Sequence, residues 1–406
     1  MNKANHFPGF HEVIEVIDGS NEFQPAINSS ADDTAPPTVE SRAGTHPLSL
    51  PANDWQREFA AGMTQTSKML TRGWMSPDQV DDAEKVKDLF DLRVPKIFFS
   101  GIENGDLTLA RQVIPSNEEL NFSSLELEDP IGDESWSPVD GITHRYQDRV
   151  LLKPTFICAV YCRFCFRRYK VSNSKHNLRG QELVNALQYI EAHTEIKEVI
   201  LSGGDPLTLN DHQLEKLFSR LAQIDHIEII RIHTRIPTAL PSRVTDQFVD
   251  LLSKCKKTVW IVAHINSESE ITSEPKAAFA KIANAGIPML CQSVLLKGIN
   301  DSEEALLRLF RSLIRQRVKP YYLHYPDLAQ GTHHFRIPLE KAISLVKNLR
   351  GKVSGYALPQ LIIDLPNGKG KVVVEGQWAK QLDEHRWEFQ SPLTGEPVIV
   401  EYPDYK

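Results

Sequence analysis

Helical and strand patterns alternate along the chain from about residue 183 to residue 323. Helical repeats of leucine, valine and isoleucine separate short apolar runs that are typical of strands. The predicted strands are 198–201, 227–232, 258–265, 288–296 and 320–323. Helices and strands that alternate at this length indicate a parallel sheet with helical crossovers, either open or closed into a barrel. Ligands of such folds gather at the carboxyl ends of the strands, so we expect the function there.

Three cysteines in the loop before these strands form the most specific motif. Cys158, Cys162 and Cys165 have the spacing C-x3-C-x2-C. A closed four-iron cluster takes four thiolates, so three leave one iron open to a ligand that is not protein. The alternatives are a zinc site or buried free thiols. Structural zinc needs four ligands and normally arranges its cysteines as two separated pairs, which this sequence lacks.

Polar residues mark the ends of three predicted strands. The strand at 198–201 ends in Ser202-Gly203-Gly204-Asp205. Two glycines let a backbone approach a ligand closely, and a carboxylate accepts hydrogen bonds from an ammonium group. A tight turn capped by Asp205 explains the same residues. His264 and Gln292 lie on later apolar strands and need hydrogen bonds from a cofactor or from a neighbouring side chain.

Two further clusters contain cationic residues. Arg145, Tyr146 and Arg149 precede the strand at 150–152, where composition alone favours surface ion pairs. Near the C-terminus, the sequence Asp364-Leu365-Pro366-Asn367-Gly368-Lys369-Gly370-Lys371 either cradles a phosphate or links two strands. A lysine beside such a turn can form a Schiff base with pyridoxal phosphate.

Composition and charge exclude several classes of protein. The 406-residue chain has a net charge of −7, which argues against a nucleic-acid-binding protein. It has no stretch of 18 apolar residues and no apolar signal-peptide core. We therefore expect a cytoplasmic protein that binds neither nucleic acid nor membrane. In a reducing compartment, Cys255 and Cys291 are expected to be small core residues rather than a disulfide.

The patterns divide the chain into four parts. The first is rich in Ser, Asn, Asp, Thr and Pro and is predicted to be disordered. The second has a helical pattern, in which Trp55, Phe59 and Met63 recur as packing residues. The third is the alternating α/β region, and the last carries the glycine- and lysine-rich turn. Their expected bounds are 1–50, 51–140, 141–345 and 346–406.

Taken together, these motifs resemble the lysine 2,3-aminomutase family of radical S-adenosylmethionine (radical SAM) enzymes over roughly residues 55–400. The resemblance implies a radical SAM partial (β/α)6 barrel with an N-terminal helical region and a C-terminal extension that binds pyridoxal phosphate. It also implies an isomerase that moves the amino group of L-lysine, or of a close basic amino acid, from C2 to C3. The implied cofactors are a [4Fe-4S] cluster, S-adenosylmethionine and pyridoxal phosphate.

The resemblance assigns a role to each motif residue. The cluster ligands would be Cys158, Cys162 and Cys165. The residues that bind S-adenosylmethionine would be Ser202, Gly203, Gly204, Asp205, His264 and Gln292. Pyridoxal phosphate would be held by the Schiff-base lysine Lys371, with Lys369 as a weaker competitor, and by Arg145, Tyr146 and Arg149. Arg167 would bind the substrate carboxylate, and Asp327 with Asp364 its distal ammonium.

Some residues depart from the family pattern. Arg163-Phe164-Cys165-Phe166-Arg167 is closer to relatives that isomerise a lysine for attachment to elongation factor P. Those relatives lack an aspartate at the position of Asp364, so a lysine isomerase for elongation factor P modification is the second hypothesis. The clostridial enzymes carry additional zinc-binding cysteines near the C-terminus. No cysteine follows Cys291 here, so we predict no zinc.

The implied partners are the amino acid substrate, a flavodoxin- or ferredoxin-type reductant and further copies of the chain in a homo-oligomer. A hypothesis from another class is a non-catalytic iron–sulfur or pyridoxal-phosphate sensor. Loss of Lys371 or Asp205 would favour that hypothesis, and both residues are present.

Overall fold

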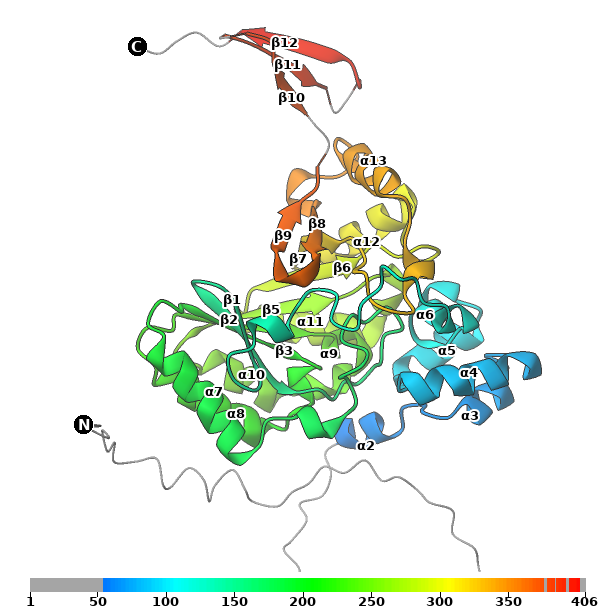
Figure 1. Ribbon diagram of the computed structural model, residues 1–406, viewed down its shortest axis with the longest axis vertical. Coiled ribbons are helices and arrows are strands. Elements are labelled where there is room, and N and C mark those ends of the chain that lie inside the picture. The colour runs from blue at the N-terminus through cyan, green and yellow to red at the C-terminus, as the bar shows by residue number, and fades with distance from the viewer. Residues whose placement is uncertain (1–53, 376–377, 384, 392–393, 402–406) are drawn as a thin grey trace, which may run out of the picture.

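The computed structural model describes residues 54–375, 378–383, 385–391 and 394–401. The segment predicted to be disordered, residues 1–50, lies outside these residues. Figure 1 shows a strongly curved sheet with helices around its outside and a group of N-terminal helices against one side. A small separate sheet near the C-terminus stands away from this body.

The middle of the chain alternates between strands and helices as predicted. The strands of the main sheet are β1 (Ile142–Tyr146), β2 (Arg149–Thr155), β3 (Glu198–Gly203), β4 (Ile229–Thr234), β5 (Thr258–His264), β6 (Met289–Val294), β7 (Val318–His324), β8 (Gln360–Leu365) and β9 (Gly370–Val373). The helices between them are α7 (Gly180–Ala192), α8 (Asp211–Ala222), α9 (Ile236–Ala239), α10 (Asp246–Ser253), α11 (Ser273–Asn284), α12 (Glu303–Arg315) and α13 (Leu339–Leu349). The five strands predicted after the cysteine loop are confirmed, with ends that differ by two residues or fewer.

The nine strands of this sheet follow one another in sequence order. Neighbours from β2 to β8 are parallel, whereas β1 and β9 are antiparallel strands at the two edges. A flat sheet of this order would separate its edges by about 38 Å, because neighbouring strands lie about 4.8 Å apart. Instead, the Lys371 backbone N–H donates to the Tyr146 hydroxyl at 2.9 Å. The sheet is therefore curled into a nearly closed barrel. This confirms the predicted partial (β/α)6 barrel, which β8 extends by a seventh parallel strand.

The hydrophobic core lies between the barrel and its outer helices. Outward-facing strand residues such as Leu201, Ile232 and Ile261 are fully buried. They pack in one cluster with the apolar faces of the helices, for example Leu187 of α7 and Leu217 of α8. Alternate residues of a strand face opposite sides, so the residues between these positions face the inside of the barrel.

The N-terminal region consists of short helices. They are α2 (Asp54–Ala60), α3 (Thr66–Thr71), α4 (Pro77–Leu89), α5 (Phe99–Glu103) and α6 (Leu107–Val113). Trp55, Phe59 and Met63 are all buried, as expected of packing residues. The helical spacing does not continue as one helix through Met63, however. The helix ends at Ala60, and Met63 forms an isolated antiparallel bridge with Val94.

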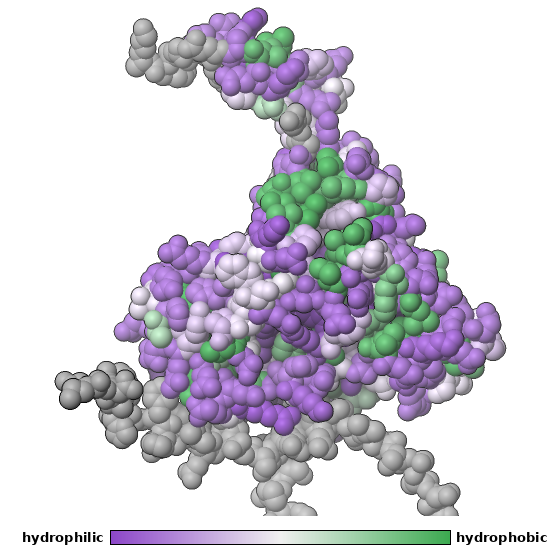
Figure 2. All heavy atoms as spheres, in the orientation of Figure 1, coloured by the Kyte–Doolittle hydropathy of each residue, from purple (hydrophilic) through white to green (hydrophobic). Residues whose placement is uncertain are grey.

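The C-terminal strands form a separate antiparallel sheet of β10 (Ala379–Gln381), β11 (Arg386–Gln390) and β12 (Pro397–Glu401). Figure 2 shows apolar residues gathered on the surface near α13, β8 and β9, where Val372 and Val373 are partly exposed. No helix within the described residues is long and apolar enough to cross a membrane.

A buried carboxylate ties the N-terminal region to the cysteine loop. Glu119 is completely buried and accepts hydrogen bonds from Arg163 Nε at 3.0 Å and from Arg163 Nη2 at 2.7 Å. It also pairs with Arg168, which donates to the backbone carbonyls of Gln330 and Gly331. Burial opposes the charge of Glu119, but the two arginines outweigh it and hold its pKa below the usual value. One side chain thus joins three segments that are distant in the sequence.

Replacing Glu119 by Ala should destabilise the protein strongly. The change leaves two buried guanidinium groups without their carboxylate, and breaking a buried ion pair in this way typically costs about 3–5 kcal/mol. The apparent free energy of unfolding, measured by urea denaturation, should fall by that amount. Glu118→Ala is the matched control because Glu118 is exposed, and we expect a change within about 0.5 kcal/mol. Equal effects of the two substitutions would contradict the anchoring role.

Candidate active site

Side chains on the inner face of the barrel surround one cavity of about 630 Å³. Along the middle of strands β3 and β4, alternate residues face the cavity, as the alternation of a strand requires. From β3, Glu198, Ile200 and Ser202 line the cavity, and from β4, Arg231 and His233 do so. The cavity wall is therefore rich in charged groups, while the outer faces of the same strands are apolar.

The structure brings all the residues predicted from the sequence to bind a cofactor or substrate to this cavity. They are Arg145, Tyr146, Arg149, Cys158, Cys162, Cys165, Arg167, Ser202, Gly203, Gly204, Asp205, His264, Gln292, Asp327, Asp364 and Lys371. The competing lysine, Lys369, is exposed and is not among the residues that line the cavity. Of the two lysines in the glycine-rich turn, Lys371 therefore lines the cavity and Lys369 does not.

The three cysteines of the motif lie in the loop after β2 and are free thiols. Burial raises the pKa of Cys165 to about 11 and that of Cys158 well above its ordinary value. Thiolates at these positions therefore need a nearby positive charge, which bound iron supplies. Among the described residues, no three His, Cys, Asp or Glu side chains converge on a single metal ion. Each thiolate of a four-iron cluster binds a different iron, so the three thiols of a cluster site need not converge on one ion.

The Ser202–Asp205 turn packs against the start of the cysteine loop. A Cβ atom on Gly204 would lie 2.5 Å from the Phe156 carbonyl carbon, and Gly203 has a φ of +102°. The two glycines are therefore required by a close approach of the protein backbone itself. The Asp205 carboxylate accepts hydrogen bonds from the Thr234 hydroxyl and from backbone N–H groups, including that of Arg235. This is the turn-capping arrangement that the residues alone suggested, and burial raises the pKa of Asp205 to about 6.

His264, predicted to bind S-adenosylmethionine, lies beside the cysteine loop. Its ring stacks on Phe164, with ring centroids 5.6 Å apart and planes inclined by 20°. Asn266 Nδ2 lies 3.2 Å from His264 Nε2. Burial lowers the pKa of His264 well below its ordinary value, so the ring is neutral near pH 7. His264 thus presents an uncharged aromatic ring beside Phe164 in the cavity wall.

Asp133 connects two of the predicted arginines. Its Oδ2 atom accepts hydrogen bonds from Arg167 Nε at 2.9 Å and lies 2.8 Å from Arg167 Nη2, while its Oδ1 atom lies 3.5 Å from Arg145 Nη2. Burial opposes the Asp133 charge, but Arg167 and Lys153 outweigh it and hold the pKa of Asp133 below its usual value. Arg167 Nη1 also donates to Ser202 Oγ at 3.2 Å. These contacts hold the Arg167 guanidinium against the cavity wall.

A second group of charges lies at the β8–β9 hairpin. The Lys371 ammonium donates to Asp364 Oδ2, and His324 Nδ1 lies 3.7 Å from the same oxygen. Asp327 is close enough that its pKa is raised to about 7, first by burial and then by the Asp364 charge. The two predicted ammonium-binding aspartates are thus neighbours, with the predicted Schiff-base lysine beside them.

Arg149 sits at the rim of this group. Its guanidinium lies 4.0 Å from the centroid of the Tyr146 ring, and its Nη1 atom donates to Asp148 at 2.6 Å. The pairing with Asp148 is the surface contact that composition suggested. The stacking on Tyr146 nevertheless keeps the cation beside the cavity, where its Nη2 and Nε groups remain available to an anion.

Sequence reasoning did not assign a role to several polar or charged residues in or beside the cavity. Asp133, Arg231, His233, Arg235 and His324 line the cavity, and Lys153 donates to Thr143 in its wall. A signal for three of them was present, because Arg231, His233 and Arg235 alternate along β4 and the residue that follows it. Asp133 and Lys153 carried no such signal, since only folding places them beside Arg167.

Several buried polar atoms around the cavity have no hydrogen-bond partner among the described residues. They are Oδ1 of Asp133, Nε of Arg145, Nε2 of His233 and Oδ1 of Asp364. Unpaired buried polar atoms are rare in proteins and often mark the place of a ligand. The polar wall, the free thiols and the cavity lysine together fit the cluster, S-adenosylmethionine and pyridoxal phosphate in the chemistry of their donor groups.

Comparison with known proteins agrees with this site. The family model of the Radical SAM superfamily matches residues 152–310, which include the cysteine loop and strands β3 to β6. The L-lysine 2,3-aminomutase of Fusobacterium nucleatum is 37% identical over 82% of this chain and 79% of that protein. The L-lysine 2,3-aminomutase of Methanococcus maripaludis is 40% identical over 72% of this chain and 68% of that protein.

A protein of the same name from Escherichia coli is 36% identical, and the match covers 81% of this chain and 96% of that protein. These matches extend well beyond the cysteine loop, from the N-terminal helical region into the C-terminal part of the chain. The chain therefore belongs to the lysine 2,3-aminomutase family of the radical SAM superfamily.

Proposed function

We propose that this protein is a radical SAM, pyridoxal-phosphate-dependent 2,3-aminomutase that converts L-lysine, or a close basic amino acid, to the β-amino acid. The observation that carries the proposal is the adjacent pair Asp327 and Asp364 beside Lys371, in the same cavity as Arg167 and the three cysteines. The names of the relatives support lysine as the substrate.

Each cofactor has a set of residues to hold it. Cys158, Cys162 and Cys165 would ligate the [4Fe-4S] cluster, and the Ser202–Asp205 turn with His264 and Gln292 would bind S-adenosylmethionine. Lys371 would carry pyridoxal phosphate, with Arg145, Tyr146 and Arg149 around it. When bound, the first two groups supply a radical that abstracts hydrogen, and pyridoxal phosphate supplies a conjugated system that delocalises the unpaired electron.

The protein would orient the substrate from its two charged ends. The Arg167 guanidinium would bind the α-carboxylate, because Asp133 holds its Nε and Nη2 edge and leaves Nη1 directed to Ser202 and the cavity. Asp133 also keeps the local charge near neutral before the substrate enters. A substrate held at both ends has little freedom to turn, which is the positioning that a radical reaction needs.

The carboxylate pair would bind the distal ammonium of the substrate. In the structure the Lys371 ammonium already donates to Asp364. When Lys371 is engaged with the cofactor, a substrate ammonium can take over that place, so Asp327 and Asp364 share a cationic partner in both states. The side-chain carboxylate of a dicarboxylic amino acid such as glutamate would instead meet two carboxylates, and like charges would reject it.

The cluster must receive an electron from outside the protein. We propose a small flavodoxin- or ferredoxin-type donor in the cytoplasm for this role.

Anaerobic incubation of the reconstituted, reduced protein with S-adenosylmethionine, pyridoxal phosphate and L-lysine should yield β-lysine, detected by mass spectrometry. If 5′-deoxyadenosine forms without β-lysine, the radical chemistry stands and the substrate assignment is wrong. If neither forms with any basic amino acid, the proposed activity fails.

Replacing Lys371 by Ala should abolish covalent attachment of pyridoxal phosphate. The Lys371 side chain points toward Asp364 in the cavity, whereas Lys369 is exposed. After borohydride reduction, peptide mass spectrometry should place the cofactor on Lys371 in the unchanged protein. The matched control, Lys369→Ala, should keep the attachment at full stoichiometry. Attachment that survives in Lys371→Ala but is lost in Lys369→Ala would reverse the assignment.

Lysine binding should weaken as the pH falls through about 7. The pKa of Asp327 is raised to about 7, so its carboxyl group is neutral below this pH and charged above it. A neutral Asp327 loses its attraction for the distal ammonium, and the KM for L-lysine should rise steadily between pH 8 and pH 6. In the Asp327→Asn variant KM should be higher and its dependence on pH in this range much flatter. A wild-type KM that is constant over the range would contradict the role of Asp327.

A further inference from the structure

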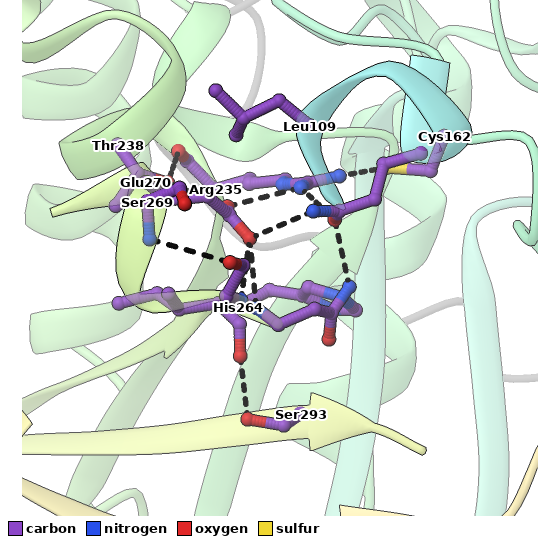
Figure 3. A network of polar contacts seen from close by, with 12 residues as sticks. Leu109, Cys162, Arg235, Thr238, His264, Ser269, Glu270 and Ser293 are labelled. Atoms are coloured by element: carbon purple, nitrogen blue, oxygen red, sulfur yellow. Dashed lines mark hydrogen bonds and ion pairs between the residues drawn. The ribbon is translucent and has the colours of Figure 1, made fainter. Parts of the chain in front are cut away.

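Arg235 directs a buried positive charge at one cysteine of the motif. It follows β4, and its side chain is almost completely buried. Its Nη1 atom donates a hydrogen bond to Cys162 Sγ at 2.7 Å. Figure 3 shows the Arg235 guanidinium lying between Glu270 and the Cys162 sulfur.

A polar network fixes the guanidinium in this position. Arg235 Nη2 lies 3.0 Å from Glu270 Oε2 and also donates to Gln112 Oε1. Gln112 Nε2 donates in turn to Glu270 Oε1, which also accepts the backbone N–H of Asn266 at 2.8 Å. These residues come from α6, from the residue that follows β4 and from the segment after β5. The network therefore leaves Arg235 little freedom to turn away from Cys162.

The arrangement differs from an ordinary buried ion pair, and the same protein provides the comparison. Arg163 gives both Nε and Nη2 to the Glu119 carboxylate. Arg235 gives only Nη2 to Glu270, and its buried Nε atom has no hydrogen-bond partner among the described residues. The Nη1 group is thus directed to sulfur although a fork-like contact with the carboxylate would satisfy two donors at once.

The positive charge of Arg235 also favours an electrostatic effect on the Cys162 sulfur. A guanidinium group keeps its positive charge in proteins even when it is buried, and the Arg235 guanidinium contacts the Cys162 sulfur directly. Arg235 is therefore a permanent cation, whereas Glu270 partly offsets its field from the far side. A fixed cation next to a cluster ligand stabilises the extra electron of the reduced cluster, because reduction makes the cluster more negative.

We propose that Arg235, through its charge and its hydrogen bond to the Cys162 sulfur, raises the reduction potential of the iron–sulfur cluster, and that Glu270 limits this increase. The inference rests on the proposed function, since it needs a cluster at Cys158, Cys162 and Cys165. In the step concerned, the cluster gains one electron from the flavodoxin- or ferredoxin-type donor, and no bond is made or broken. Arg235 is thus a residue that tunes the cluster from outside its ligand set.

The test is an anaerobic redox titration of the full-length protein after reconstitution with iron and sulfide, without S-adenosylmethionine. The midpoint potential is read from the electron paramagnetic resonance signal of the reduced cluster. Arg235→Gln should shift the midpoint to a more negative value, because the cation is lost. Glu270→Gln should shift it to a more positive value, because the charge of Arg235 is less offset. Opposite signs distinguish an electrostatic role from a structural one.

Arg243→Gln is the matched control. Arg243 is also a fully buried arginine, but its hydrogen bonds go to the carbonyls of Leu207 and Leu209, and its ion pair is with Asp211. Its removal should leave the midpoint potential unchanged, even if the protein becomes less stable. A shift equal to that of Arg235→Gln would overturn the proposal, because it would show a general effect of losing a buried cation.

The outcomes separate this inference from the proposed function. If the unchanged protein assembles no four-iron cluster, the proposed function fails and the inference fails with it. If it assembles the cluster but both Arg235→Gln and Glu270→Gln leave the midpoint unchanged, only the inference fails. If Arg235→Gln does not retain a cluster, Glu270→Gln decides alone: a positive shift supports the proposal, and a zero or negative shift overturns it.

Discussion

Charges inside the barrel need partners, because an isolated charge in a buried site is strongly unfavourable. This constraint organises the interior of the protein. Each pair joins elements that are separate in the sequence or on different strands, so the charges also fix how those elements meet. The pairs around the cavity are Arg167 with Asp133, Arg231 with Glu198, Arg235 with Glu270 and Lys371 with Asp364. Outside the cavity, Glu119 forms ion pairs with Arg163 and Arg168 and in this way fixes the cysteine loop.

The same constraint explains why the cavity suits charged ligands. Asp133 forms an ion pair with Arg167 and also lies near Arg145. Asp364 forms an ion pair with Lys371 and also lies near Arg145 and His324. Carboxylates and cations are therefore shared rather than matched one to one. A substrate that carries both a carboxylate and an ammonium group can exchange with these internal partners, so each of its charges meets an opposite charge. This costs less free energy than bringing ions into an apolar pocket.

The barrel could be predicted from the sequence because its signals are local. Apolar strands and amphipathic helices alternate with clear periods, and those periods persist in the structure. The end of the helix before Met63 has an equally physical cause. Trp55, Phe59 and Met63 have helical spacing, yet Met63 gains a backbone bridge to Val94, a contact between residues far apart in the chain. The local spacing of apolar residues gives no information about such a long-range contact.

The site was predictable where its residues form motifs. The cysteines, the Ser202–Asp205 turn and the glycine- and lysine-rich turn are compact in sequence, so resemblance found them. Asp133 and Glu270 were missed because their significance lies in the arginine that each contacts, and that arginine is distant along the chain. Arg235 offered a partial signal, as the third charged or polar residue in an alternating series with Arg231 and His233. The series indicated an inward face, but the contact with Cys162 required the fold.

The way in which the barrel closes has a consequence for how large cofactors reach its interior. Strands β1 and β9 do not pair with each other. They are joined by one hydrogen bond from Lys371 to Tyr146, by the 3.7 Å approach of Arg145 to Asp364 and by the packing of Gly132 on Asn367 and Gly368. A hydrogen bond of this kind contributes about 0.5–1.5 kcal/mol, far less than a strand ladder. Parting this lateral seam would break no backbone ladder of the sheet, so entry of a bulky molecule from this side would not require any strand to lose its pairing.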